Sequence, residues 1–156
     1  MKKLLGCILA LMCLFSLACA EGIYDSVQVT FEDGFTLSLP ADWVSFEVTP
    51  AQAESGIIYC LGSADGSQTM YIQRWATDAK SIDDLSAALS GRTEIENSIT
   101  GVSDSGQPFL MYNFADADAS GCMQLFDGSI LNFIFTPQSS NDLMLTAAFL
   151  IATAQF

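Results

Sequence analysis

Aspartate-glycine pairs recur between segments of alternating apolar and polar residues, and this pattern constrains the fold more than any other feature. Such a pair favours the tight turn of a β-hairpin, and the alternation favours strands with one buried face. The pairs are Asp33-Gly34, Asp65-Gly66 and Asp127-Gly128, and Ser105-Gly106 is a related turn signal. They lie within the predicted hairpins 27–39, 57–75, 94–114 and 122–135. We expect an antiparallel sheet of about six to eight strands.

Three helices are indicated by their end signals. Ser81 and Asp84 form a capping box before an apolar stripe at helical spacing, and Gly91 follows as a stop. A short helix is predicted over 50–55, where Thr49 is the cap and Pro50 takes the first position. A C-terminal helix is predicted over 140–155.

Two late strands, 109–114 and 130–135, are apolar on both faces. A strand of this kind is covered on both sides, so helices must lie on both faces of the sheet. The predicted fold class is therefore α+β, with an antiparallel sheet sandwiched by helices and a closing C-terminal helix. We expect these two strands to be central and the 27–39 hairpin to lie nearer an edge.

The segment from Asp33 to Trp43 resembles the opening of the PsbP/Mog1-like superfamily. It reads D-G-F-T-L-S-L-P-A-D-W, which matches the pattern D-G-F-x-hydrophobic-x-hydrophobic-P-x-x-W, and the later order of elements is similar too. The resemblance implies an antiparallel sheet between helical layers and a non-catalytic binding or assembly role. It carries over no functional residue, because members of one fold bind unrelated partners.

The first 20 residues have the pattern of a signal peptide. Lys2 and Lys3 precede an apolar run over 4–17, and Ala18-Cys19-Ala20 follows as a cleavage site. The run is shorter than the roughly 20 residues of a transmembrane helix, so no membrane span is expected after cleavage. The prediction is a secreted or extracytoplasmic single domain over 21–156. The alternative is a lipoprotein anchored at Cys19.

Charge and composition exclude several function classes. The chain has 18 acidic and 5 basic residues, a net charge of -13, and no histidine. This charge repels nucleic acid, so the expected partner is a protein or an envelope component. The lack of histidine removes histidine-based nucleophile systems and histidine-bearing zinc sites. No cofactor is expected.

Tyr71 and Trp75 form the candidate ligand-binding pair, since they share one face of a predicted strand with Gln73. The alternative is that both side chains are buried in the core, because large aromatic side chains contribute most to core burial. Trp43 is interpreted as a core anchor and Arg74 as a surface cation with a buried stem.

Two further residue groups suggest specific chemistry. Cys60 and Cys122, the only cysteines after the signal peptide, form either a disulfide or two buried free thiols. Asp116, Asp118 and Ser120 match the first positions of a calcium loop. Strands are predicted on both sides of this loop, so we expect a tight acidic turn without a specific calcium site.

Two functions remain open at this stage. The first is an extracytoplasmic, non-catalytic module that binds a partner. The alternative is a small carboxylate-dependent hydrolase of cell-envelope or gut-type glycan, since glycoside hydrolysis needs only two carboxyl groups. The pairs Glu94 with Glu96 and Asp116 with Asp118 are the carboxylates considered for it.

Overall fold

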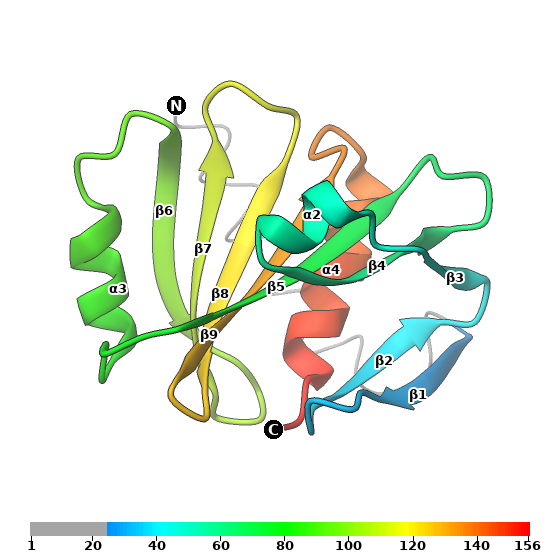
Figure 1. Ribbon diagram of the computed structural model, residues 1–156, viewed down its shortest axis with the longest axis horizontal. Coiled ribbons are helices and arrows are strands. Elements are labelled where there is room, and N and C mark those ends of the chain that lie inside the picture. Colours follow the sequence, from blue (N-terminus) through cyan, green and yellow to red (C-terminus); the bar gives the residue numbers. More distant parts are fainter. Residues whose placement is uncertain (1–24) are drawn as a thin grey trace.

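The computed structural model describes residues 25–156, which contain a seven-stranded antiparallel sheet and a separate two-stranded hairpin (Figure 1). The large sheet has the order β3-β4-β5-β9-β8-β7-β6. In chain order its strands are β3 (Trp43–Phe46), β4 (Ile57–Ser63), β5 (Thr69–Ala76), β6 (Ile95–Val102), β7 (Pro108–Phe114), β8 (Ser120–Phe126) and β9 (Ser129–Thr136). The hairpin consists of β1 (Ser26–Thr30) and β2 (Thr36–Pro40). The predicted signal peptide at 1–20 and the alternative anchor Cys19 lie outside the described residues.

Two of the three helices begin at the caps that the sequence indicated, and the third begins one residue after the predicted start at Ser140. α2 (Pro50–Glu54) and α3 (Ile82–Leu89) each start with a capping box, formed at Thr49 and at Ser81. α4 (Asn141–Thr153) starts at Ser140, whose side chain accepts a hydrogen bond from the Leu143 N–H. Within residues 25–156 none of the helices combines the length and apolarity that crossing a membrane requires.

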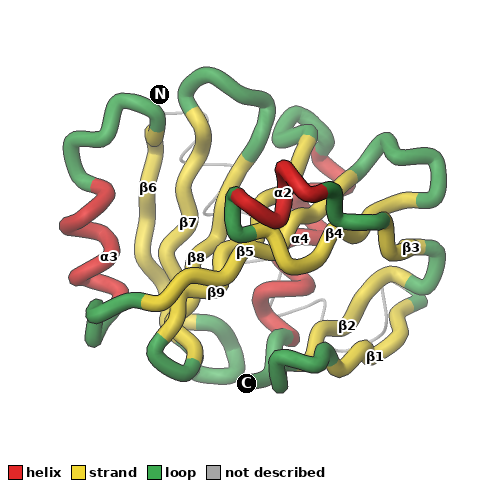
Figure 2. The backbone as a smooth tube through the Cα atoms, in the orientation of Figure 1, coloured by secondary structure: helices red, strands yellow, loops and turns green. Residues whose placement is uncertain are grey.

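The main sheet carries an apolar core on each of its two faces, because successive strand residues point to opposite sides. On one side, the α4 face, the core joins strand residues to α4 and to the β1–β2 hairpin. On the other, the α3 face, Leu110, Tyr112 and Met123 pack against α3. Figure 2 shows α2 in front of the sheet and α4 behind it. The predicted α+β sandwich with a closing C-terminal helix is confirmed.

The predicted position of two segments within the sheet was wrong. The early hairpin does not form an edge of the main sheet, because its buried residues pack toward α4 and Thr36 pairs with Gln155 beyond that helix. β9 is the middle strand, whereas β7 lies next to the edge strand β6. β7 is still covered on both faces, since Leu110 packs on α3 and Phe109 lies in the opposite core.

The Asp33-Gly34 turn is tied to the main sheet by charge. The Asp33 carboxylate accepts a 2.8 Å hydrogen bond from the Tyr59 hydroxyl and pairs at 2.9 Å with the Arg74 guanidinium. The guanidinium also lies 5.7 Å from the centroid of the Phe126 ring. The Arg74 side chain is 24% exposed, in keeping with a cation that has a buried stem, and its charged head pairs with Asp33.

Cys60 and Cys122 are buried free thiols. Cys60 pairs with Tyr71 on the α3 face, whereas Cys122 belongs to the α4-face core. Two strands, β5 and β9, separate the strands that carry them. Three strand spacings of about 4.8 Å exceed the roughly 7 Å that a disulfide can span between Cα atoms. Of the two alternatives, the structure therefore contains the free thiols, and burial raises the pKa of both.

Candidate functional site

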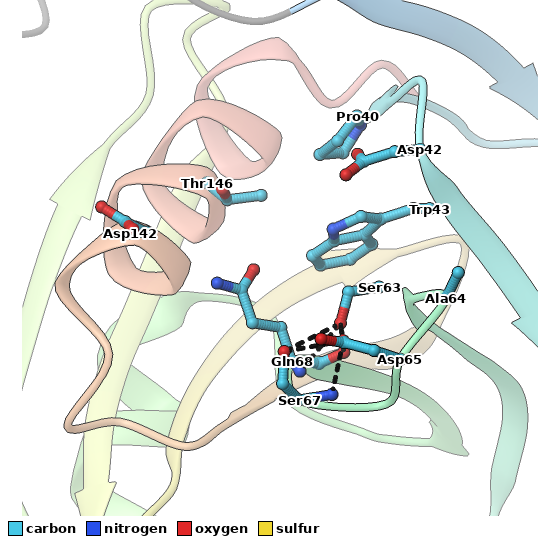
Figure 3. A pocket seen from close by; sticks show the side chains of 10 residues that line it. All are labelled: Pro40, Asp42, Trp43, Ser63, Ala64, Asp65, Ser67, Gln68, Asp142 and Thr146. Carbon is cyan, nitrogen blue, oxygen red and sulfur yellow. Dashed lines mark hydrogen bonds between the residues drawn. The ribbon is translucent and has the colours of Figure 1, made fainter.

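An open pocket of about 510 Å³ lies where the β2–β3 link, the β4–β5 turn and the first turns of α4 meet (Figure 3). We call it the Trp43 pocket. It is lined by Pro40, Asp42, Trp43, Ser63, Ala64, Asp65, Ser67, Gln68, Asp142 and Thr146. Its volume falls within the roughly 300 to 1,000 Å³ of small-molecule sites, so it has room for a small ligand or for a partner's side chain.

Trp43 forms the apolar centre of the pocket. Its indole lies between Asp42 and Ser63 in Figure 3 and is directed toward Thr146 of α4. The residue is half-buried and also packs against the α4-face core. Trp43 is therefore the core anchor that we expected, but it also presents part of its ring to the pocket.

The hydrogen bonds that hold Asp65 in its turn all reach the same carboxylate oxygen. Its Oδ1 atom accepts bonds from the Ser67 N–H at 2.9 Å, the Ser63 hydroxyl at 2.7 Å and the Ser67 hydroxyl at 2.7 Å. These bonds, with the Ser67 N–H contributing most, lower the pKa of Asp65 to about 2. The other oxygen, Oδ2, receives no hydrogen bond from the described residues. Asp65 therefore stays ionised and keeps one oxygen available.

The pocket is strongly negative, because Asp42 and Asp142 join Asp65 at its margin. Asp142 lies in the first turn of α4, where the helix dipole favours a carboxylate. Within residues 25–156 the ion pairs are Arg74 with Asp33 and the exposed pair of Arg92 with Glu94 at 3.5 Å. None of the three pocket carboxylates is neutralised by a basic side chain of the described residues.

Tyr71 and Trp75, the predicted ligand pair, lie on the α3 face and outside the Trp43 pocket. Trp75 packs with the α3 core, and its Nε1 would be 2.7 Å from a Cβ atom added to Gly56. Tyr71 pairs with Cys60 and with Ile134, and its burial raises its pKa. The two rings have different surroundings, and their role in ligand binding stays a prediction.

Hydrogen-bonded side chains fill the α3 face beside this pair. The Tyr112 ring lies over Gly121, where an added Cβ atom would clash with the ring. Its hydroxyl donates a 3.0 Å bond to Asn132, whose amide donates a 2.9 Å bond to Gln73. Burial raises the pKa of Tyr112 to about 12. The chain of bonds holds the neutral phenol in place.

The calcium-like segment already has partners within the chain. The Asp118 carboxylate accepts bonds from the Ser139 N–H at 2.8 Å and the Ser139 hydroxyl at 2.6 Å. The Ser120 hydroxyl lies 2.9 Å from Asn113 Oδ1 and 3.0 Å from Gln138 Oε1. In the described part of the chain no three acidic, cysteine or histidine side chains gather as a metal site. Asp116 lies beside Asp118 in the β7–β8 loop, outside the pocket.

The fold defines the class of protein: an α+β domain in which an antiparallel sheet lies between helices. The solution structure of cyanobacterial PsbP (CyanoP) from Synechocystis sp. PCC 6803 is similar, with a TM-score of 0.59 over 87% of this chain and 95% of that chain, at 14% sequence identity. The chain thus has a PsbP-like fold, as the Asp33–Trp43 segment indicated.

A crystal structure from Bacteroides thetaiotaomicron VPI-5482 matches with a TM-score of 0.47 and 15% identity, over 78% of this chain and 44% of that chain. No protein-family model and no curated protein matches the sequence.

Proposed function

We propose that this protein is an extracytoplasmic, non-catalytic binding or assembly module that contacts its partner through the Trp43 pocket. The observation that carries the proposal is an indole in an open pocket, bordered by three carboxylates that have no basic partner within residues 25–156. Tryptophan is enriched among the anchor residues of protein interfaces. The PsbP-like fold supports a binding role as well.

The extracytoplasmic location rests on the sequence. The Lys2-Lys3 pair, the apolar run and the Ala18-Cys19-Ala20 site are typical of an exported chain. Export would leave one acidic domain over 21–156, either free or anchored at Cys19. Intact mass of the exported form distinguishes a chain that begins at Glu21 from one that carries lipid on Cys19.

The proposed function is tested by affinity capture from a cell-envelope extract of the organism that encodes the chain. The wild-type protein should retain a partner that Trp43→Ala captures at least roughly tenfold less, the loss expected for an interface anchor. Leu145→Ala is the matched control, because Leu145 is an exposed apolar residue of α4 outside the pocket. Equal capture by both variants, with equal unfolding midpoints in urea, would reject the pocket as the contact site.

Glycan hydrolysis is the second candidate, because the pocket combines an aromatic ring with carboxylates. A glycosidase needs a protonated carboxyl group of raised pKa as its acid. The pKa of Asp65 is shifted the opposite way, which leaves Asp42 and Asp142 as possible acids. Release of reducing ends from envelope glycan, lost in Asp42→Asn or Asp142→Asn, would establish this activity instead.

A further inference from the structure

The negative charges that line the Trp43 pocket favour a cationic ligand. Asp42, Asp65 and Asp142 are all exposed, and none has a basic partner among the described residues. Because the Oδ2 atom of Asp65 accepts no hydrogen bond from residues 25–156, it can accept one from a donor that enters the pocket. An anionic ligand would be repelled here, and a neutral one would leave the charges unpaired.

The aromatic ring of the pocket favours the same ligand. The face of an indole attracts a cation within about 6 Å of the ring centre. Trp43 is the only tryptophan that borders the three carboxylates, since Trp75 packs with the α3 core. A basic side chain could therefore place its methylene groups on the indole and its charged head among the carboxylates.

The edge of the sheet indicates what presents this side chain. β3 ends the strand order, and it pairs with β4 on one side only. Beyond that ladder, residues 43–46 make no backbone hydrogen bond to the rest of the described chain. Val44 is 40% exposed, and Ser45 is exposed too. The free side of β3 can therefore accept an extended segment as an added strand.

The geometry of such a strand connects the edge with the pocket. Ser45 pairs with Leu61, which belongs to the α4-face core, so Trp43 and Ser45 both point to that face. Alternate side chains of a strand added beside β3 would point to the same face. One of them would lie beside the Trp43 indole.

Resting on the function proposed above, we infer that the pocket binds a lysine or arginine side chain of an extended partner segment that pairs with β3. The negative charge of the whole chain, -13, also favours the approach of a basic partner. The carboxylates provide the charge, Trp43 the apolar contact, and the edge of β3 the main-chain hydrogen bonds.

The test is an NMR titration of the ¹⁵N-labelled protein with a capped peptide, Gly-Ser-Thr-Val-Lys-Val-Thr-Ser-Gly. We expect saturable shifts of the Trp43 indole N–H and of the backbone amides of 43–46. The same peptide with norleucine in place of lysine should bind at least roughly tenfold more weakly, because it keeps the unbranched carbon stem but lacks the charged amino group. Equal binding of the two peptides would overturn the inference.

Carboxylate variants identify the groups that recognise the cation. Asp65→Asn and Asp142→Asn should each raise the dissociation constant about fivefold, as expected for loss of one partly screened charge pair. Asp78→Asn is the matched control, since Asp78 is exposed and outside the pocket. Equal effects of all three substitutions would mean that only the net charge matters, which also contradicts the inference.

Two further results separate the parts of the proposal. If free lysine amide binds as tightly as the peptide, strand pairing with β3 is rejected. If Trp43→Ala abolishes capture of the natural partner while the lysine peptide does not bind, the proposed function holds and the cationic ligand is wrong. If Trp43→Ala changes neither capture nor peptide binding, both proposals fail.

Discussion

The turns at Asp33-Gly34 and Asp65-Gly66 share one dipeptide, yet their aspartates have opposite surroundings. Asp33 uses both carboxylate oxygens on partners from the main sheet, Tyr59 and Arg74. Asp65 uses one oxygen on serines of its own turn, and the other accepts no hydrogen bond from the described part of the chain. The first therefore connects two parts of the fold, whereas the second borders a pocket. The dipeptide predicts the turn, and the residues that lie opposite it determine the role of the carboxylate.

The largest effect should come from removing the connection made by Asp33. Asp33→Ala deletes one ion pair and one hydrogen bond to a charged acceptor, both partly buried, and should lower the free energy of unfolding by about 2 kcal/mol. Urea denaturation measures the change. Asp33→Asn should lose less, because its amide oxygen can still accept one bond. A loss for Asp33→Ala below about 0.5 kcal/mol would show that surface screening dominates this pair.

The next prediction compares the cost of the left-handed backbone at the glycines of the two turns. Gly34 has a φ of +91° and Gly66 a φ of +72°, and an added Cβ would meet no atom closer than 3.9 Å at either position. Gly34→Ala and Gly66→Ala should therefore each cost about 1 kcal/mol, from the left-handed backbone alone. Equal losses in urea would assign the difference between the turns to their aspartates. A much larger loss at Gly34 would assign it to the backbone.

The pKa of Tyr59 should show whether its hydrogen bond to Asp33 is present. Burial, and then the hydrogen bond to Asp33, raise the pKa of the Tyr59 phenol above its usual value of 10.0. The stability that this shift provides is present below pH 10 and is lost as the pH rises through the folded-state pKa. In an ultraviolet titration, Asp33→Asn should bring the Tyr59 pKa part of the way back. An unchanged pKa would exclude the charge of Asp33 as a cause of the shift.

The smallest effect concerns Asp65, at the acid end of the scale. Its pKa of about 2 lies below its ordinary value of 3.8, so its charge favours the folded turn above about pH 4. This contribution should disappear as the pH falls through about 2. Carbon-13 NMR of the carboxyl group measures the titration. Ser67→Ala should raise the pKa only in part, because the Ser67 N–H, the strongest cause, remains.

Local signals predicted much of the fold. Asp127 and Gly128 both have positive φ, at 46° and 67°, as a two-residue hairpin turn requires. Ser81 caps its helix as its spacing to Asp84 indicated. The order of the strands was not predictable in this way, because the pairing of β5 with β9 joins segments far apart in the sequence. β3 was missed, since its four residues give too short an alternation to detect.

Less of the candidate site than of the fold could be predicted from the sequence. Trp43 was identified only as a core residue, because a pattern of alternation does not show how much of its ring the later elements cover. Asp42 and Asp65 could have been noticed as carboxylates near a tryptophan and a turn. Asp142 could not, since its position depends on how a helix about a hundred residues later packs against the early strands. Tyr71 and Trp75 were correctly placed on one face.

The unpaired side of β3 also affects how copies of the protein interact with one another. An unpaired sheet edge invites identical chains to join edge to edge and aggregate. Here the strand has only four residues, and Asp42 and Glu47 flank it. Two copies that met at this edge would bring four carboxylates together, in addition to the mutual repulsion of two chains of charge -13. The same acidity that suits a basic partner thus opposes edge-to-edge pairing of two copies.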